Sequence, residues 1–481
     1  MKKNLHNDNI IRQSNGGFIM SSNSKIFEEE KISKLLVKFS VPIVFSLLVS
    51  ELYNMVDTFF VGRVIGGNGI GALGVVFPIQ RIIVALSVLI SVGTSTAFSR
   101  SNGKKDTKKS KRILENGFTL SYCIMIPLTI FLYFCKEQVL IIFGASKDIL
   151  PLAQDYLGLI LFGSVFLSLT IFISDIMVAL GNSKISIIST SIGAIINVIL
   201  DYITVMHMNM GVKGAALATS VSQFIGFIYA YYNYRKMTKE FNVSLRFELD
   251  KKIIMPIVLV GVSAFIVEAE DGILMAVLNN LLKGSDMGII VLGVISKVYM
   301  FLFVTLCGIA SAMQPIAAYN IGSKNYKRLK SIMKKTNLYA FVTSTIIWAI
   351  SMIFAPQFIQ IFVKDAEIIK ESAKAFRIMI SVFPVISVYY VSIYYFQARG
   401  NAKTSVLLSV SRQLLIMIPI SVILVKGFNL GQMGVWISYP ISDILASLGS
   451  YMLIKNEGME LNIAIRKQNE IEKTKGQYIL N

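Results

Sequence analysis

Long apolar segments recur along the whole chain, and they limit most strongly the folds that it can adopt. Each is long enough for an α-helix to cross the hydrocarbon core of a bilayer, which takes about 20 residues. Only helices and closed barrels satisfy their backbone polar groups in lipid, and these segments lack the alternation of barrel strands. We therefore expect an all-α polytopic membrane protein with about twelve transmembrane helices. The expected spans are residues 35–61, 71–99, 113–135, 150–180, 185–207, 211–234, 253–282, 288–318, 337–362, 375–398, 404–425 and 432–454.

The distribution of charge fits a membrane protein better than a nucleic-acid-binding protein. The formal net charge is +19, yet only 16% of the 481 residues are charged and 54% are hydrophobic. Lysine and arginine gather in the connections 100–112, 235–252 and 324–335, between apolar segments. Such loops are cytoplasmic by the positive-inside rule. We expect a multi-pass protein of the cell membrane, with both termini cytoplasmic, lipid around it and no nucleic-acid partner.

The two halves of the chain resemble each other. Ala179-Leu-Gly-Asn182-Ser-Lys184 matches Ala398-Arg-Gly-Asn401-Ala-Lys403, and Pro42 precedes Asp57 by the same spacing as Pro256 precedes Asp271. Six spans per half make parallel repeats, and transporters place their solute cavity between such halves. We expect a monomer with a cytoplasmic tail, an amino-terminal lobe, a cytoplasmic linker, a carboxyl-terminal lobe and a second cytoplasmic tail. Their predicted bounds are 1–33, 34–234, 235–252, 253–455 and 456–481.

Four polar side chains of the first half are predicted to share one depth in the membrane. Asp57 lies near the end of the first span, and Asn197 and Asp201 lie one helical turn apart on the fifth. Thr219, on the sixth span, returns to that level. Two carboxylates with amide and hydroxyl neighbours could bind Na⁺ or share a proton, whereas the alternative is hydrogen bonding between helices. We favour a coupling site, because carboxylates in lipid are rarer than serine, threonine or asparagine.

A second group of acids lies on the seventh span, where Glu268, Glu270 and Asp271 follow one another. Lys297, on the eighth span, is a candidate partner for them. A coupling site in the second lobe and a neutralised structural cluster explain these acids equally well.

Other ionisable residues within spans are expected to be structural or paired. Arg412 and Gln413 are predicted to form an interhelical contact with Asp443, and Asp175 to be solvated or paired. Glu51 points to a different face of the first span from Asp57.

The sequence contains no enzyme motif in the structural context that its chemistry requires. Gly69-Ile-Gly-Ala-Leu-Gly74 has the spacing of a dinucleotide-binding loop, but it joins two apolar helices and follows no strand. The sequence has no phosphate-binding GxxxxGK[ST] loop, and His6 and His207 are its only histidines. We expect no enzyme and no cofactor apart from Na⁺ or H⁺ as the coupling ion.

Seven motifs in order resemble those of multidrug and toxic compound extrusion (MATE) transporters, over about residues 30–455, and are most similar to the bacterial branch that includes the staphylococcal multidrug exporter. They begin at Tyr53, Ala179, Asn197, Met210, Gln314, Phe396 and Gly434, and read YNMVDTFFVG, ALGN, NVILD, MGVKGAALAT, QPIAAYNIG, FQARG and GVWISYPISD.

The resemblance implies two six-helix bundles around a central cavity, alternating access, and export of organic, often cationic drugs in exchange for Na⁺ or H⁺. In similar proteins the cation site of the first lobe falls on Asp57, Asn197, Asp201 and Thr219. Tyr53 and Asn54 of the first motif are counted with that site. Such export would contribute to antibiotic resistance.

Two alternatives use the same twelve-span plan. A flippase for lipid-linked glycans or other amphiphiles should line its cavity with several cations, but Lys297, Arg377 and Arg412 are the few expected in mid-span positions. A membrane receptor or scaffold without transport would give the acids of both halves no evident purpose.

Overall fold

The structure, a computed structural model, describes residues 26–241, 243 and 249–479, without the side chains of residues 53, 54, 240, 286 and 472–479. Within those ranges every regular element is a helix. The first half contains α1 (Ile26–Glu29), α2 (Ile32–Ile65), α3 (Gly67–Gly103), α4 (Thr107–Phe134), α5 (Lys136–Ile142), α6 (Leu150–Ala179), α7 (Lys184–Asp201), η1 (Tyr202–His207), α8 (Gly211–Met237) and η2 (Lys239–Phe241).

The second half repeats this arrangement with more breaks. It contains α9 (Lys251–Leu281), α10 (Asp286–Gly322), α11 (Tyr326–Ile353), α12 (Ala355–Gln360), α13 (Ala366–Met379), η3 (Phe383–Ile386), α14 (Ser387–Arg399), α15 (Ala402–Val410), η4 (Ser411–Met417), α16 (Ile418–Val422), η5 (Ile423–Gly427) and α17 (Gln432–Ile479). The stretches η1, η4 and η5 are π-helical.

The number of apolar helices agrees with a polytopic membrane protein. Ten helices in the described part of the chain are long and apolar enough to cross a bilayer, or eleven if α13 and the η3–α14 segment form one span bent by 49°. Pro384 lies at this bend, where its ring prevents a regular helix. The helix α8 is less apolar and is not among them; its 27 residues pack against α6 and α7.

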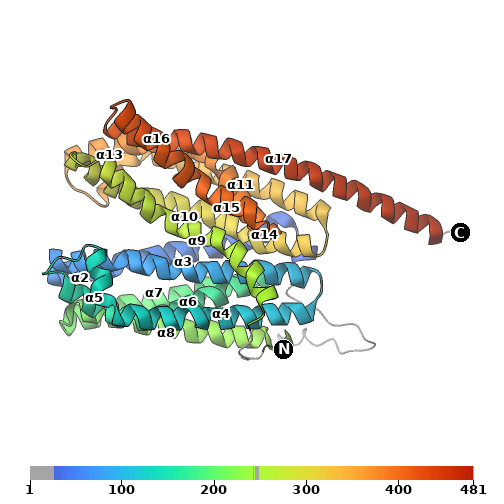
Figure 1. Cartoon of the computed structure of the whole chain (residues 1–481), viewed down its shortest axis with the longest axis horizontal. Coiled ribbons are helices and arrows are strands. Elements are labelled where there is room, and N and C mark those ends of the chain that lie inside the picture. Colours follow the sequence, from blue (N-terminus) through green and yellow to red (C-terminus); the bar gives the residue numbers. More distant parts are fainter. Residues whose placement is uncertain (1–25, 242, 244–248, 480–481) are drawn as a thin grey trace, which may run out of the picture.

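Several observed bounds differ from the predicted spans. The bent tenth span begins at Ala366, earlier than residue 375, because its first part is amphipathic rather than uniformly apolar. The last helix continues from Gln432 to Ile479, through most of the segment predicted as a tail. In Figure 1 this part of α17 extends well beyond the rest of the bundle.

Two equivalent turns show how the repeat is built. Lys105 and Lys324 both have a positive φ, at 60° and 58°. Each is followed by a residue that caps the next helix: Asp106 accepts a hydrogen bond from the backbone N–H of Lys109, and Asn325 accepts one from Arg328. We call the end of the bundle that carries these two turns the basic end.

The two lobes lie side by side, and α9 crosses obliquely from the second lobe toward the first (Figure 1). Across the boundary, α3 packs on α9 and α10, and α2 packs on α10. Near the basic end, a Cβ on Gly103 would lie 2.0 Å from the carbonyl oxygen of Tyr319, and one on Gly322 would lie 2.1 Å from that of Arg100. Glycine therefore allows α3 and α10 to approach backbone to backbone.

A side chain of the first lobe also caps a helix of the second. The Arg100 guanidinium donates to the carbonyl oxygens of Gln397 and Ala398, at 3.3 and 2.8 Å. These carbonyls lie in the last turn of α14, which ends at the left-handed Gly400. The cation thus meets the negative end of a helix dipole.

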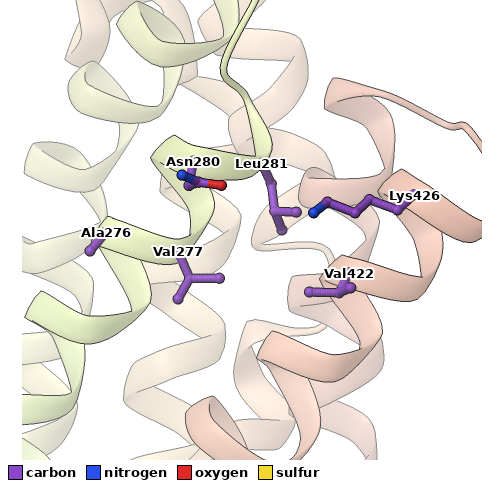
Figure 2. A pocket seen from close by; sticks show the side chains of 6 residues that line it. All are labelled: Ala276, Val277, Asn280, Leu281, Val422 and Lys426. Atoms are coloured by element: carbon purple, nitrogen blue, oxygen red, sulfur yellow. The ribbon is translucent and has the colours of Figure 1, made fainter.

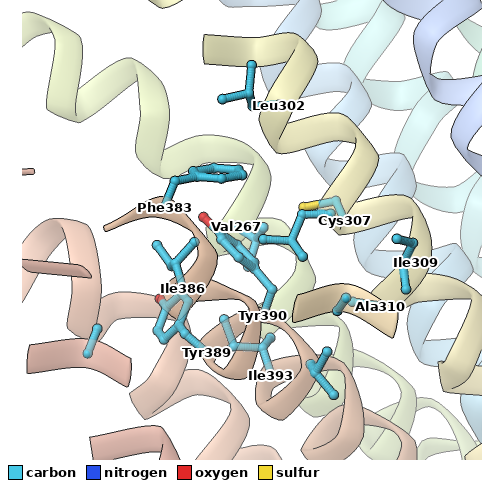
Figure 3. Packing of buried hydrophobic residues seen from close by; sticks show 14 of the residues in the cluster. Val267, Leu302, Cys307, Ile309, Ala310, Phe383, Ile386, Tyr389, Tyr390 and Ile393 are labelled. Carbon is cyan, nitrogen blue, oxygen red and sulfur yellow. The ribbon is translucent and has the colours of Figure 1, made fainter. Parts of the chain in front are cut away.

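The second lobe has a large aromatic and aliphatic core. Figure 3 shows Tyr389, Tyr390 and Phe383 packed against Val267 of α9 and Cys307 of α10. The rings of Tyr389 and Tyr390 meet edge to face, with centroids 5.1 Å apart. This core fixes α14 against α9 and α10.

Candidate functional site

Asp57 lies in a buried polar cluster inside the first lobe, away from the basic end. The hydroxyl groups of Tyr156 and Thr219 donate to its Oδ2 at 2.9 and 2.7 Å, and the amide of Asn197 donates to its Oδ1 at 3.2 Å. Four helices, α2, α6, α7 and α8, supply these side chains. The exposed fraction of Asp57 is 3%, so its carboxyl depends on protein donors in place of water.

Asp201 lies next to this group but has no donor of its own. Its side chain is fully buried and close to the Asp57 carboxyl and to Asn197. By the same geometric criterion that gives Asp57 three hydrogen bonds, neither oxygen of Asp201 accepts one from a described residue. The Oδ1 atom of Asn197 is also buried without a partner. Three oxygen atoms of these two residues, Oδ1 and Oδ2 of Asp201 and Oδ1 of Asn197, are therefore buried without a hydrogen-bond donor.

The local sequence explains how these groups meet. Asn197 and Asp201 are four residues apart on α7, so they share one face of the helix. That face packs on both α2 and α8, which carry Asp57 and Thr219. The structure thus brings together the four residues that depth and spacing singled out.

One member of the cluster was not predicted from the sequence. Tyr156 lies in the second turn of α6, where a tyrosine in a membrane protein usually marks the lipid interface. Tyr156 lies at the same depth in the membrane as Asp57, and this shared depth could have indicated the contact between them. Tyr53 and Asn54 were also predicted to belong to the site, but their side chains lie outside the part of the chain that the structure describes.

The chemistry of the cluster suits a hard monovalent cation or a proton. Its possible ligands are two carboxylates, an amide oxygen and hydroxyl groups, and hard cations prefer oxygen ligands. In the described part of the chain, no group of three or more His, Cys, Asp or Glu side chains could hold a metal ion.

The three acids of α9 do not form one cluster. Glu270 is buried, and its Oε2 atom has no partner among the described residues. Asp271 is exposed and accepts a hydrogen bond of 2.7 Å from Gln413. Glu268 and Asp271 lie within electrostatic range of Arg81 of the first lobe. Lys297 was expected to be their partner, but it is exposed, and no ion pair joins it to a described residue.

The predicted contact between Arg412 and Asp443 is present deep in the second lobe. The Arg412 Nε atom donates to Asp443 Oδ1 at 2.8 Å, and both side chains are almost fully buried. The guanidinium also donates to the hydroxyl groups of Tyr390 and Tyr299, at 3.1 and 2.8 Å. Asp175, expected to be solvated or paired, accepts a hydrogen bond from Ser91.

A cleft of about 360 Å³ opens elsewhere, between the end of α9 and the η5 stretch. Figure 2 shows Lys426 reaching across it toward Leu281 and Asn280. Ala276, Val277 and Val422 complete its lining, so it includes none of the acids described above.

Comparison with known proteins identifies the family. The model of the MatE family matches residues 42–203 and 256–423, which is more than half of the chain and includes both repeats. The chain belongs to the MATE family. Its relatives include the multidrug export protein MepA of Staphylococcus saprophyticus, which is 25% identical over 438 residues, covering 89% of this chain and 94% of that protein. MepA of Staphylococcus aureus is 23% identical over 434 residues, with the same two coverages.

Solved MATE structures have the same fold. A crystal structure of a MATE protein in the bent conformation superimposes with a TM-score of 0.86 and 23% identity, covering 92% of this chain and 99% of that one. One in the straight conformation also gives 0.86, at 23% identity, covering 92% and 100%. The predicted all-α fold with two six-helix lobes is thus the MATE fold.

Proposed function

We propose that this MATE protein is a secondary antiporter that exports organic cations in exchange for Na⁺ or H⁺, with the cluster around Asp57 as its coupling site. Membership in the family and relatives named as multidrug export proteins support export of small organic compounds. The coupling role is argued from the polar cluster itself.

One observation carries the proposal: Asp201 is a buried carboxyl group without a donor, beside a second carboxyl group. Two ionised carboxylates at such a place repel each other and lack hydration, so the pair needs a proton or a cation to be neutral. Asp57 has its donors from Tyr156, Asn197 and Thr219, which makes Asp201 the group that most needs a ligand. A buried pair of this kind is expected of a site that takes up and releases an ion.

The exchange follows from competition between two charge states of the first lobe. With its ion bound, the Asp57–Asp201 pair is neutral or singly negative and the helices α2, α7 and α8 pack closely around it. With the ion released, repulsion between the carboxylates favours a different helix arrangement, so the gradient biases which arrangement is populated. One charge that enters across 100 mV contributes about 2.3 kcal/mol, close to a fifty-fold concentration of solute.

For the orientation, we propose that the basic end is cytoplasmic. The positive-inside rule favours it, because the turns at 104–106 and 323–325 are followed by runs of lysine. The Asp57 cluster then lies in the outer half of the membrane. An inward gradient would fill it from outside.

The flippase alternative is less well supported. A diphosphate group requires several cations gathered at one place, whereas Arg412 is buried deep in the second lobe and paired with Asp443.

The decisive experiment measures ethidium flux in proteoliposomes while a Na⁺ gradient and a pH gradient are imposed separately. One of the two gradients should drive ethidium uphill, and Asp57→Asn should abolish that drive. Ethidium flux that ignores both gradients would refute ion coupling.

A further inference from the structure

We propose that Arg81 is a specificity-determining residue: its guanidinium occupies the cation position between the lobes, and a cationic solute must displace it. The inference rests on the proposed export of organic cations, and it concerns a place other than the coupling site.

The surroundings of Arg81 are those of a bound organic cation. Its Nη2 atom donates to both carboxylate oxygens of Glu51, at 3.0 and 2.8 Å, and this contact joins α3 to α2. The guanidinium carbon also lies 5.0 Å from the centroid of the Phe77 ring, one turn earlier on α3. A carboxylate and an aromatic face are the two features that recognise organic cations in proteins. In this protein the Arg81 side chain contacts both the carboxylate and the aromatic face.

The second lobe brings two more acids near Arg81. Glu268 and Asp271 of α9 lie within electrostatic range of the Arg81 guanidinium, in addition to the ion pair with Glu51. These side chains are only partly buried: the exposed fractions of the Arg81 and Glu51 side chains are 29% and 16%. The protein therefore does not fully enclose Arg81 and Glu51, and the acids near them outnumber the single guanidinium.

An independent observation supports a ligand at this place. Gln413 is buried and donates through Nε2 to Asp271, while its Oε1 atom accepts no hydrogen bond from any residue that the structure describes. A buried amide oxygen is seldom left unpaired. A solute with an N–H or O–H group beside Asp271 would satisfy it.

The physical consequence is competition within one site. While Arg81 binds Glu51, an incoming cation gains less, because one carboxylate and one aromatic face are already taken. Removing the guanidinium leaves both without their present partner and makes the surroundings of Glu51 more negative by one charge. At the few ångströms involved, one unit of charge changes affinity by about tenfold.

The test is equilibrium dialysis of tritiated tetraphenylphosphonium against the purified full chain in detergent, without any ion gradient. Arg81→Gln should lower the Kd about tenfold. Adding Glu51→Gln to Arg81→Gln should reverse most of that gain. Arg63→Gln is the matched control, because Arg63 also lies over a phenylalanine, 5.9 Å from the Phe59 ring, but has no carboxylate partner in the described part of the chain, so its Kd should not change.

A second variant guards against misfolding of Arg81→Gln. Arg81→Lys keeps the charge but loses the planar fork, so its weaker hold on Glu51 should tighten tetraphenylphosphonium binding by about threefold. Equal or weaker binding by a folded Arg81 variant would overturn the role of Arg81 and leave the proposed antiport intact. If neither wild type nor Arg81→Gln binds the probe, the choice of organic cations is wrong, and the role of Arg81 is wrong with it.

Discussion

Asp57 and Asp201 lie next to each other, yet Tyr156, Asn197 and Thr219 each donate a hydrogen bond to Asp57 and, by the same geometric criterion, none to Asp201. The two acids are thus unequal before any ion arrives. Asp57 is held in place by its hydrogen-bond donors, whereas Asp201 has none and needs a proton or a cation to be neutral. Each of the first three predictions tests one part of this asymmetry.

Replacing Asp57 by asparagine should abolish gradient-driven ethidium export, because the amide removes the charge that the site takes up and gives back. The protein should still fold, since an amide can accept from Tyr156 and Thr219. Asp155→Asn is the control: Asp155 is adjacent to Tyr156 in sequence but forms only an exposed ion pair with Lys213, so export should persist. The measurement is the rate of ethidium flux in proteoliposomes.

Tyr156→Phe should slow coupled export by about tenfold, because Asp57 loses one hydrogen bond to a charged group, typically about 1.5–3 kcal/mol. The effect should appear in the concentration of coupling ion needed for half-maximal flux. A variant whose flux and ion dependence equal those of the wild type would show that the tyrosine only fills space.

Asp201→Asn should unfold at a temperature equal to or above that of the wild type in detergent at neutral pH. The amide has the shape of the acid but cannot ionise, so it never incurs the penalty of a buried carboxylate without a donor, about 1–3 kcal/mol. The same variant should lose coupled export. A clearly lower melting temperature would mean that Asp201 is stabilised by a bound ion or proton already under those conditions.

In the second lobe, Arg412→Met should destabilise the protein strongly, by about 3–5 kcal/mol, because it leaves Asp443 charged and unpaired in the core. The double variant Arg412→Met with Asp443→Leu should recover most of that loss. Lys213→Ala breaks an exposed ion pair and should change stability by less than about 1 kcal/mol. Thermal unfolding in detergent compares the three.

Gly103→Ala should separate α3 from α10 at the basic end, because the new Cβ would lie 2.0 Å from a backbone carbonyl oxygen that cannot move away by itself. Spin labels at Lys108 and Lys327, both exposed, should report a longer mean distance. Gly272→Ala is the control, since a Cβ there meets nothing within 4 Å. An unchanged distance in Gly103→Ala would show that the lobes can shift to make room.

The sequence predicted much of the first-lobe cluster, because the cost of a carboxylate in lipid makes Asp57 and Asp201 conspicuous and helix periodicity relates Asn197 to Asp201. It did not predict Tyr156, whose position near a helix end has an ordinary explanation at the lipid interface. Nor could it show which cation lies near Glu268 and Asp271. That cation, Arg81, comes from the other lobe, and the packing of one repeat on the other depends on contacts such as Gly103 on Tyr319, which no periodicity shows.

The position of Arg81 is also conspicuous in the sequence. It interrupts an apolar segment at a depth where a guanidinium is costly, which is the argument that singled out Asp57. The π-helical stretches are a different matter. Their extra residue per turn follows from tertiary packing, and the residues of η1 and η4 have no composition that sets them apart from the α-helix before them.

The η1 stretch has one more consequence, because it begins immediately after Asp201. A π-helical turn contains about one residue more than an α-helical turn, so the η1 stretch carries one surplus residue. If it moved one turn toward the start of α7, Asp201 would rotate by about 100° around the helix axis, the angle of a single residue. A displacement as small as that would part the two acids and turn one of them toward a new set of neighbours.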